Sequence, residues 1–188
     1  MSSHQVFLLS PANCTGTRAG WLLRRNGRSP LAQQLRSGAG ATIGDVFTLI
    51  SGLYFRGKLA YALAFARPPE GCAGIQVIVP GRGLCAHDTV IDRRELRAIA
   101  RVRVDAGERR YTGPLRRDAA RLAARLYEQD GAVLLGSIAT RKYLDPLSIL
   151  GARLRFPEEF VGRGDMSRGA LLLRCAAEGR ELHYRSGL

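Results

Sequence analysis

The chain has 188 residues, 46% of them hydrophobic, and this length favours a single domain (1–188) with a sizeable core. It contains no run of about 18 apolar residues, which excludes a membrane-spanning helix and favours the cytoplasm, with the nucleoid as a possible site of action. The 29 basic residues outnumber the 16 acidic ones, giving a net charge of +13, and only Lys58 and Lys142 are lysines. An arginine excess of this size suits phosphate and base-edge contacts, so we expect DNA, duplex or single-stranded, as partner. The alternative is that the arginine excess reflects the base composition of a high-GC genome and has little functional meaning.

Four elements are expected in the first half of the chain: a fully buried strand at 6–10 and helices at 18–24, 30–35 and 57–66. Thr17 is placed to cap the first helix, and Ser29 to cap the second, with Pro30 at its first position. The apolar stretch 45–54 is ambiguous between strand and helix.

Six elements are expected in the second half: a buried strand at 75–79, a helix at 93–100, an edge strand at 100–104, a helix from Pro114, a buried strand at 132–136 and a hairpin at about 170–185. Buried strands alternating with helices predict an α/β fold. We expect a compact single domain with a largely parallel central sheet flanked by helices (about 5–168), plus a C-terminal β-hairpin.

The four cysteines form no C-x-x-C pair, and Cys85 with His87 is the only close Cys/His pair. With three histidines in the chain, a zinc site is not expected, and neither a metal nor a cofactor is predicted. Buried free thiols in a reducing compartment are the preferred interpretation.

Polar side chains follow each of the three buried strands. They are Ser10, Asn13 and Thr15 after the first, Arg82 and Asp88 after the second, and Ser137, Arg141, Lys142 and Tyr143 after the third. Gly81 and Gly83 allow a tight backbone path beside a ligand. Because the carboxyl ends of parallel strands meet at one edge of a sheet, we expect these openings to converge on one pocket.

The segment from Gly52 to Lys58 fits G-x-x-x-x-G-K, the phosphate loop of nucleotide hydrolases. Leu59 stands where that loop needs a hydroxyl for the metal ion, and bulky side chains fill its interior. A basic aromatic surface is the preferred interpretation, with Tyr54, Arg56, Lys58 and Tyr61 contacting nucleic acid. The alternative is two core aromatics flanked by solvated charges.

The segment 162–169 combines small residues with charges. Arg163 and Arg168 are placed to wrap an anion, while Asp165 and Ser167 offer a base and a hydroxyl. It does not match the G-x-S-x-G elbow of serine hydrolases, because Asp165 stands at the first glycine.

Short segments of the chain resemble the YaaA peroxide-stress family and related small bacterial domains. The matching segments are Ser10-Pro11-Ala12, Leu53-Tyr54, Gly83-Leu84 with Asp88 and Ile91, Leu134-Leu135-Gly136, Tyr143 to Leu147, Phe156-Pro157 and Gly162 to Met166. The resemblance implies a uracil-DNA-glycosylase-like α/β domain acting on nucleic acid or nucleobases. Asn13 departs from it, standing where the family pattern has lysine, and the Gly-Gln-Asp-Pro-Tyr and His-Pro-Ser-Pro motifs of uracil-DNA glycosylases are absent.

Together these features favour a DNA-directed hydrolase of N-glycosylase type, in DNA repair or stress defence. Asp88 is the expected catalytic carboxylate, with Asp45 or Asp165 as substitutes. The expected phosphate ligands are Arg82, Arg141, Lys142 and Arg163, and the expected stacking residues are Tyr54 and Tyr143. Two alternatives stay open, a non-catalytic DNA-binding protein of stress protection and a nucleotide or nucleoside enzyme. The sequence predicts no oligomeric state.

Overall fold

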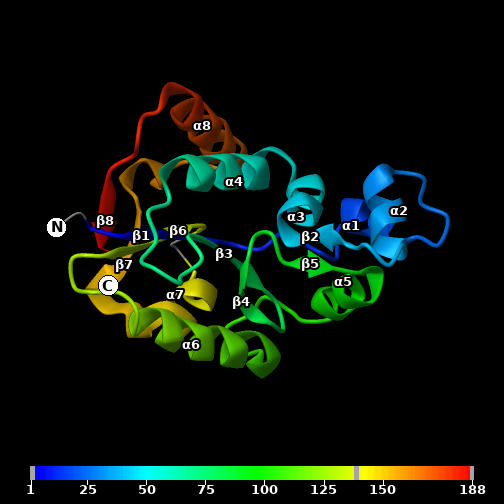
Figure 1. Cartoon of the computed structure of the whole chain (residues 1–188), viewed down its shortest axis with the longest axis horizontal. Helices are drawn as coiled ribbons and strands as arrows, with labels where there is room; N and C mark the ends of the chain where they lie inside the picture. Colours follow the sequence, from blue (N-terminus) through cyan, green and yellow to red (C-terminus); the bar gives the residue numbers. More distant parts are fainter. Residues whose placement is uncertain (1–2, 138–139, 187–188) are drawn as a thin grey trace.

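The computed structural model describes residues 3–137 and 140–186, and a six-stranded sheet of order β4-β3-β1-β6-β7-β8 crosses its centre (Figure 1). The strands are β1 (Gln5–Leu9), β3 (Ile75–Val79), β4 (Gly83–Ala86), β6 (Gly131–Leu135), β7 (Leu154–Pro157) and β8 (Tyr184–Ser186), with a separate antiparallel pair of β2 (Ala41–Thr42) and β5 (Val90–Ile91). β1 pairs in parallel with β3 and β6, and β7 continues this direction. β4 and β8 are antiparallel edges, so the predicted mixed α/β fold with a mostly parallel sheet is confirmed.

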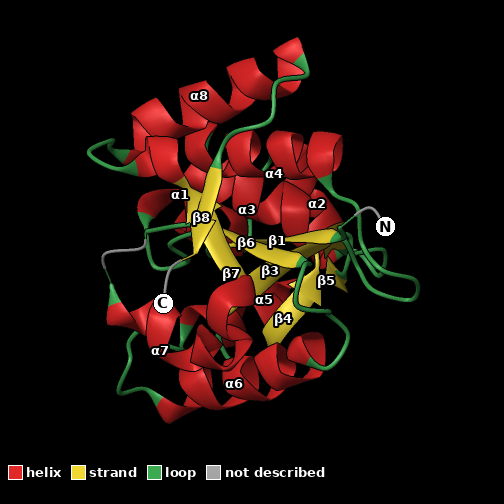
Figure 2. Ribbon diagram, turned by 90° about the vertical axis from the view of Figure 1, so that its left-hand side faces the viewer, coloured by secondary structure: helices red, strands yellow, loops and turns green. Residues whose placement is uncertain are grey.

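Helices cover both faces of the sheet, α4 and α8 on one and α6 and α7 on the other (Figure 2). Their bounds are α1 (Thr17–Leu23), α2 (Pro30–Arg36), α3 (Ile43–Ser51), α4 (Leu53–Phe65), α5 (Arg93–Ala100), α6 (Arg109–Ala123), α7 (Arg141–Leu147) and α8 (Asp165–Glu178), with 3-10 turns η1 (Ser148–Arg153) and η2 (Glu158–Phe160). No helix in the described ranges is both long and apolar enough to cross a membrane.

The central strand β1 contributes to two cores, one on each face of the sheet. Phe7 and Leu9 join the cluster built by α3, α4 and α8, while Val6 and Leu8 join the one built by α6 and α7. Alternate residues of a strand point to opposite faces, so a strand covered on both sides must be apolar throughout. This explains the unbroken apolar run at the start of the chain.

Two glycines let α4 and α8 cross in direct backbone contact. A Cβ on Gly57 would lie 2.5 Å from the carbonyl oxygen of Gly169, and a Cβ on Gly169 would lie 2.8 Å from the Cα of Tyr54. The crossing brings the side chains of α4 close to the first turn of α8.

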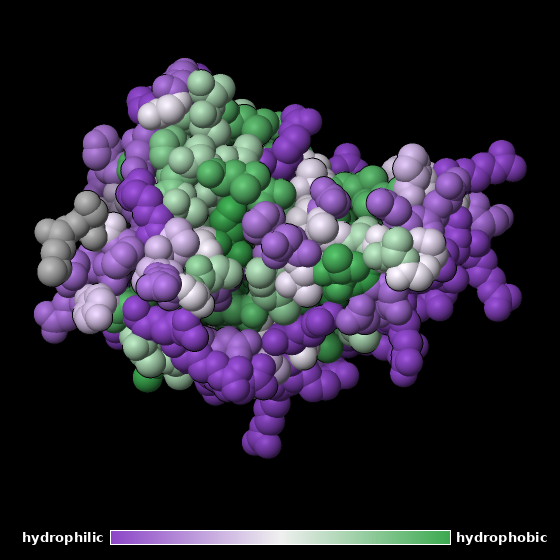
Figure 3. All heavy atoms as spheres, in the orientation of Figure 1, coloured by the Kyte–Doolittle hydropathy of each residue, from purple (hydrophilic) through white to green (hydrophobic). Residues whose placement is uncertain are grey.

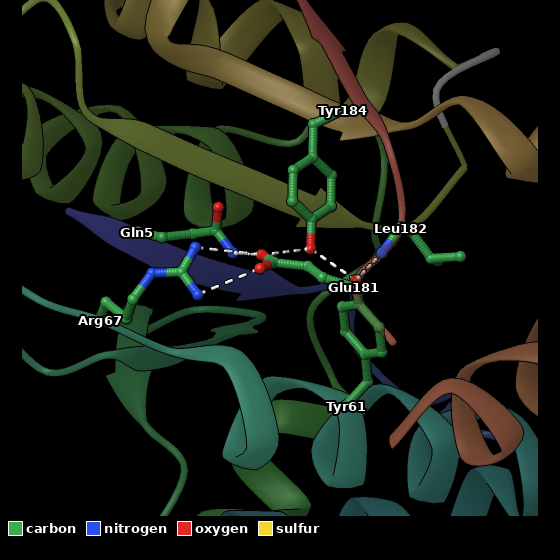
Figure 4. A network of polar contacts seen from close by, with 6 residues as sticks. All are labelled: Gln5, Tyr61, Arg67, Glu181, Leu182 and Tyr184. Atoms are coloured by element: carbon green, nitrogen blue, oxygen red, sulfur yellow. Dashed lines mark hydrogen bonds and ion pairs between the residues drawn. The ribbon is translucent and has the colours of Figure 1, made fainter. Parts of the chain in front are cut away.

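A polar network at the amino end of β1 anchors the last strand (Figure 4). The hydroxyl oxygens of Tyr61 and Tyr184 are 2.6 Å apart, and both nitrogens at the end of the Arg67 guanidinium donate to Glu181, at 3.1 and 3.2 Å. Burial raises the pKa of Glu181, but the hydrogen bonds from Arg67 and Gln5 outweigh it and leave this pKa lowered. The network therefore attaches the C-terminal segment to α4 and to Arg67 just beyond it, through a hydrogen bond and an ion pair.

The C-terminal antiparallel strand pair is present, but it consists of β7 and β8. The segment 170–175, predicted as its first strand, lies inside α8. Leu171, Leu172 and Cys175 are buried at helical spacing, while Ala170 and Arg174 are exposed. A short apolar run has no periodicity long enough to separate a strand from a helix, which explains the error.

Three smaller predictions are corrected. α6 begins at Arg109 and carries Pro114 in its interior, because the Glu108 carboxylate accepts from the Arg110 amide at 3.0 Å and caps the helix earlier. The segment 100–104 ends α5 and continues as a loop, and the N-cap of α1 is Gly16 where we expected Thr17. The ambiguous stretch 45–54 is helical on both sides of Gly52, whose φ of 65° separates α3 from α4.

Candidate functional site

The chain leaves β1 and β6 in opposite directions. After β1 it crosses to β3 over the face of α4, and after β6 it crosses to β7 over the face of α7. The carboxyl ends of two such neighbouring strands form a topological switch point, where open α/β sheets bind ligands. Ser10 follows β1 and Gly136 follows β6, and a Cβ on Gly136 would lie 2.9 Å from that of Ser10. Glycine at this position is what leaves room for the Ser10 side chain.

Lys58 of α4 reaches this point from one face of the sheet. Its Nζ donates to the carbonyl oxygen of Ser10 at 2.7 Å and to Ser10 Oγ at 2.8 Å, and the residue is 1% exposed. The ring centroids of Tyr54 and Phe55 lie 4.5 and 4.8 Å from Nζ. Burial lowers the pKa of Lys58 to about 7, opposed in part by the negative charge of Asp165. At neutral pH the amine therefore exchanges between its two protonation states, as a general acid or base must.

Two phenols border the amine. Tyr54 and Tyr143 are buried, and the Tyr54 hydroxyl has no hydrogen-bond partner within the described residues. Burial raises the pKa of Tyr54 to about 12, against the effect of the nearby Arg168. Burial also raises the pKa of Tyr143, which lies beside Ser10 and close to Tyr54 and Asp165. Both phenols stay protonated at neutral pH and are available as hydrogen-bond donors.

Asp165, the first residue of α8, places a carboxylate at the outer side of this group. Its side chain is 70% exposed and lies 3.8 Å from Nη1 of Arg168. Nε and Nη2 of Arg168 donate to the carbonyl oxygen of Phe160, at 3.2 and 3.0 Å, which fixes the guanidinium. Ser10, Tyr54, Lys58, Tyr143 and Asp165 are called the switch-point site below.

A cavity of about 440 Å³ opens at the same edge of the sheet. It is lined by residues that follow β1, β3 and β6, including Asn13, Thr15, Pro80, Lys142 and Tyr143. Residues after each of the three parallel strands line this cavity, but of the predicted polar residues only Asn13, Thr15, Lys142 and Tyr143 do so. Its volume is in the range of small-molecule sites. Tyr143 links the two features, because it lines the cavity and lies beside Ser10.

Two of the three candidate carboxylates lie elsewhere. β4 runs back from the carboxyl end of β3, with Ala86 opposite Gln76, so Asp88 follows at the amino edge and is exposed. Asp45 is exposed in the first turn of α3, where its carboxylate accepts from the Thr42 hydroxyl at 2.7 Å. Of the three candidate carboxylates, only Asp165 belongs to the switch-point site.

The remaining predicted contact residues divide between the pocket and the surface. Asn13 lines the pocket, and its Oδ1 accepts from the amide and hydroxyl of Thr15, at 3.1 and 2.7 Å. The Lys142 ammonium lies 5.2 Å from the Tyr143 ring, and the Ser137 carbonyl oxygen accepts from the Thr140 hydroxyl at 3.3 Å. The intervening residues 138–139 of this predicted loop lie outside the described residues.

Three predicted phosphate ligands have partners within the protein. Arg82 pairs with Glu95 at 2.8 Å, Arg141 with Asp145 at 3.3 Å, and Arg163 donates to the Ser167 hydroxyl at 3.2 Å. Arg56 is exposed on α4. The segment from Gly52 to Lys58 caps and opens a helix, so it does not form a phosphate loop.

Lys58 was predicted as a surface contact, and its burial is a correction. The signal was present: Tyr54, Phe55, Lys58, Tyr61 and Ala62 share one helical face at spacings of three and four residues, and all are buried. Asp105 and Tyr111 were missed. Asp105 lines the pocket from the loop after α5, and Tyr111 carries a buried hydroxyl without a partner in the described ranges.

Within the described chain, no three His, Cys, Asp or Glu side chains are grouped to hold a metal ion, and the four cysteines are free. No family model, curated protein or solved structure matches this chain.

Proposed function

We propose that the protein is a nucleic-acid-directed hydrolase that cleaves the N-glycosidic bond of a nucleobase, in DNA repair or stress defence. One observation carries the proposal: the fully buried Lys58 is hydrogen-bonded to Ser10 at the switch point, with a carboxylate close by. Burial lowers the pKa of this amine to about 7. Strongly perturbed ionisable groups beside a pocket are typical of active sites. The resemblance of short segments to the YaaA family points to the same substrates and stays a prediction.

In the proposed reaction, the bond from C1′ of the sugar to the base nitrogen breaks and its electron pair leaves with the base. The base lies in the pocket against Tyr143, and a proton passes to it from the Lys58 ammonium through Ser10 Oγ and the Tyr143 hydroxyl. This relay lets Lys58 act while it stays buried. Water adds to C1′ and gives its proton to Asp165, whose negative charge also stabilises the cationic sugar.

The charge of the chain supports a nucleic-acid substrate over a small metabolite. A free nucleoside needs few cations, whereas the net charge of +13 is carried mostly by exposed arginines. To reach the pocket, the target nucleotide has to be unstacked, either in single-stranded DNA or by flipping from a duplex.

The first test is base release from oligonucleotides that carry damaged or modified bases, measured as free base by mass spectrometry and as abasic sites by alkaline cleavage. Asp165→Asn keeps the shape of an exposed side chain and should lower the rate by about 100-fold or more. Asp88→Asn is the matched control, because Asp88 is an exposed carboxylate at the opposite edge, and it should keep the wild-type rate. Loss of activity in Asp88→Asn alone would show that the active site lies at Asp88 and not at Asp165. No base release from any substrate would reject the hydrolase.

A non-catalytic nucleic-acid-binding protein is the second candidate. It is favoured by the burial of Ser10 and Lys58, at 5% and 1% exposure, and by the two hydrogen bonds that already occupy the amine. In that case Lys58 serves only to join α4 to the end of β1. Oligonucleotide binding with no base release in wild-type protein or variants would support this candidate.

A further inference from the structure

The single tryptophan of the chain lies on the surface. Trp21, on α1, is 51% exposed and has no aromatic or cation–π partner among the residues that the structure describes. A single exposed aromatic ring is common on protein surfaces, but tryptophan is enriched at interfaces because its ring combines a large apolar area with a polar N–H. Trp21 lines a hollow of about 420 Å³ formed by α1, the loop between α1 and α2, and Leu49 of α3. Three exposed arginines share this hollow: Arg18, Arg24 and Arg28.

More arginines continue this surface onto α2 and α5. Arg93 donates to the carbonyl oxygen of Leu23 from Nε and Nη2, at 3.1 and 2.9 Å, and Arg36 donates to that of Gly27 at 2.6 Å. Burial and the positive charges of Arg97, Arg25 and Arg36 lower the pKa of Arg93. These arginines are held by neutral carbonyls, so their charge is not cancelled.

The arginines on this surface have no acidic partner within 4 Å among the described residues. They are Arg18, Arg24, Arg25, Arg28, Arg36, Arg93 and Arg97. In Figure 3, hydrophilic side chains project from the end of the molecule that α2 and α5 form. Mutually repelling cations held in place without a counter-charge are suited to bind a polyanion.

We propose that Trp21 and these arginines, called the Trp21 surface, bind single-stranded nucleic acid, with one base stacked on the indole and phosphates on the guanidinium groups. Stacking requires the face of an unpaired base, which a continuous duplex does not offer. The inference rests on the proposed function only in taking nucleic acid as the partner, since neither the indole nor the arginines belong to the switch-point site.

The Trp21 surface begins next to the pocket. Thr15 lines the pocket, α1 starts at Thr17, and Trp21 lies four residues further along this helix. With a rise of 1.5 Å per residue, Trp21 is about 6 Å along the axis from Thr17. A strand that crosses α1 can therefore stack a base on Trp21 while a neighbouring nucleotide approaches the pocket. The substrate class that follows is unpaired DNA or RNA flanking the target base.

The test uses the intrinsic fluorescence of the protein, because its one tryptophan reports on this surface alone. Titration with a dodecamer of thymidylate should quench Trp21 emission with the same midpoint as the anisotropy change of a labelled dodecamer. Trp21→Ala should weaken the binding measured by anisotropy by about 5- to 150-fold, the range of one base–aromatic stack. Tyr127→Ala is the matched control, since Tyr127 is also an exposed aromatic, 67% exposed beyond α6, and should leave the affinity unchanged.

Two results would overturn the inference: binding of the dodecamer without quenching, or equal quenching by polyaspartate, which has charge but no bases. Asp165→Asn separates the two proposals. It should lower the rate of base release from a modified oligonucleotide and leave the quenching of Trp21 emission by the dodecamer unchanged. Quenching by oligonucleotide in a protein that releases no base would support the Trp21 surface and reject the hydrolase.

Discussion

At the scale of single residues, Lys58 couples protonation to folding. Between its native pKa of about 7 and its usual pKa of 10.5, the amine is neutral in the native state and charged in the unfolded chain. Unfolding then takes up a proton, so the contribution of Lys58 to stability rises with pH above about 7 and is constant below it. Asp165 raises the pKa of Lys58, so its removal should extend this window to lower pH.

We predict that the stability difference between wild-type protein and Lys58→Met changes with pH. From pH 7.5 to 9 the wild-type protein should gain about 1.4 kcal/mol per pH unit relative to the variant. Urea unfolding at a series of pH values measures both curves, and taking their difference cancels the cysteines, which titrate near pH 9 in the unfolded chain. Lys142→Met, which changes the other, half-exposed lysine, should give a curve parallel to wild type. A parallel curve for Lys58→Met would contradict the lowered pKa.

The residue types of the site could be predicted from the sequence, but their arrangement could not. Ser10, Tyr143 and Asp165 were named because they follow strands or lie in a glycine-rich segment. The contact between Ser10 and Lys58 spans 48 residues and depends on how α4 crosses the sheet. Asp88 was preferred because it follows β3 closely in sequence, but β4 carries the chain back to the opposite edge. Closeness to a strand in the sequence is therefore a poor guide to which carboxylate lies at the carboxyl end of that strand.

At the scale of elements, the crossing of α4 and α8 depends on Gly169. Replacing an exposed helical glycine by alanine usually stabilises a protein by about 0.4–1 kcal/mol. At Gly169 the added Cβ would lie 2.8 Å from the Cα of Tyr54 and 2.9 Å from the carbonyl oxygen of Leu53, both backbone atoms that cannot move aside separately. The two helices must separate, and the switch-point site opens with them.

We therefore predict that Gly169→Ala lowers the free energy of unfolding by about 1–3 kcal/mol, the usual cost of overpacking. Gly20→Ala is the matched control, because Gly20 is exposed in α1 and its Cβ would meet nothing within 4 Å. Denaturant unfolding should show a small gain for this control. A gain of the same size for Gly169→Ala would mean that the helices do not touch as described.

The elements were easiest to predict where burial leaves one interpretation. The runs 6–10, 75–79 and 132–136 are mostly apolar and buried, with Gln76 the one half-buried polar residue inside a run, and each forms a strand of the parallel core of the sheet. The segment 170–175 is as apolar and as short, yet it is helical because α4 offers it a groove to pack against. Tertiary contacts decide whether this segment is a strand or a helix, and the local sequence does not.

At the scale of the whole molecule, the net charge of +13 predicts binding that weakens with salt. The logarithm of the affinity for a thymidylate dodecamer should fall with the logarithm of salt concentration, with a slope of about −0.7 per contacted phosphate. The double variant Arg24→Ala/Arg28→Ala should make this slope shallower by about 1.4, because two phosphate contacts are lost. Anisotropy titrations at several salt concentrations measure it, with Arg116→Ala on α6 as control, and an unchanged slope would remove these two arginines from the interface.

The strand that is made first occupies the middle of the sheet. β1 pairs with β3, whose first residue is Ile75, and with β6, which ends at Leu135. The apolar residues of β1 therefore acquire their last partner after about seven tenths of the chain. At a synthesis rate of about 5–20 residues per second, β6 follows β1 from the ribosome by roughly 6–25 s. During that interval the apolar segment 6–9 of the nascent chain has no β6 partner, so its apolar surface is exposed. The topology that creates the switch point therefore also leaves the first strand without its sheet neighbours until most of the chain has been synthesised.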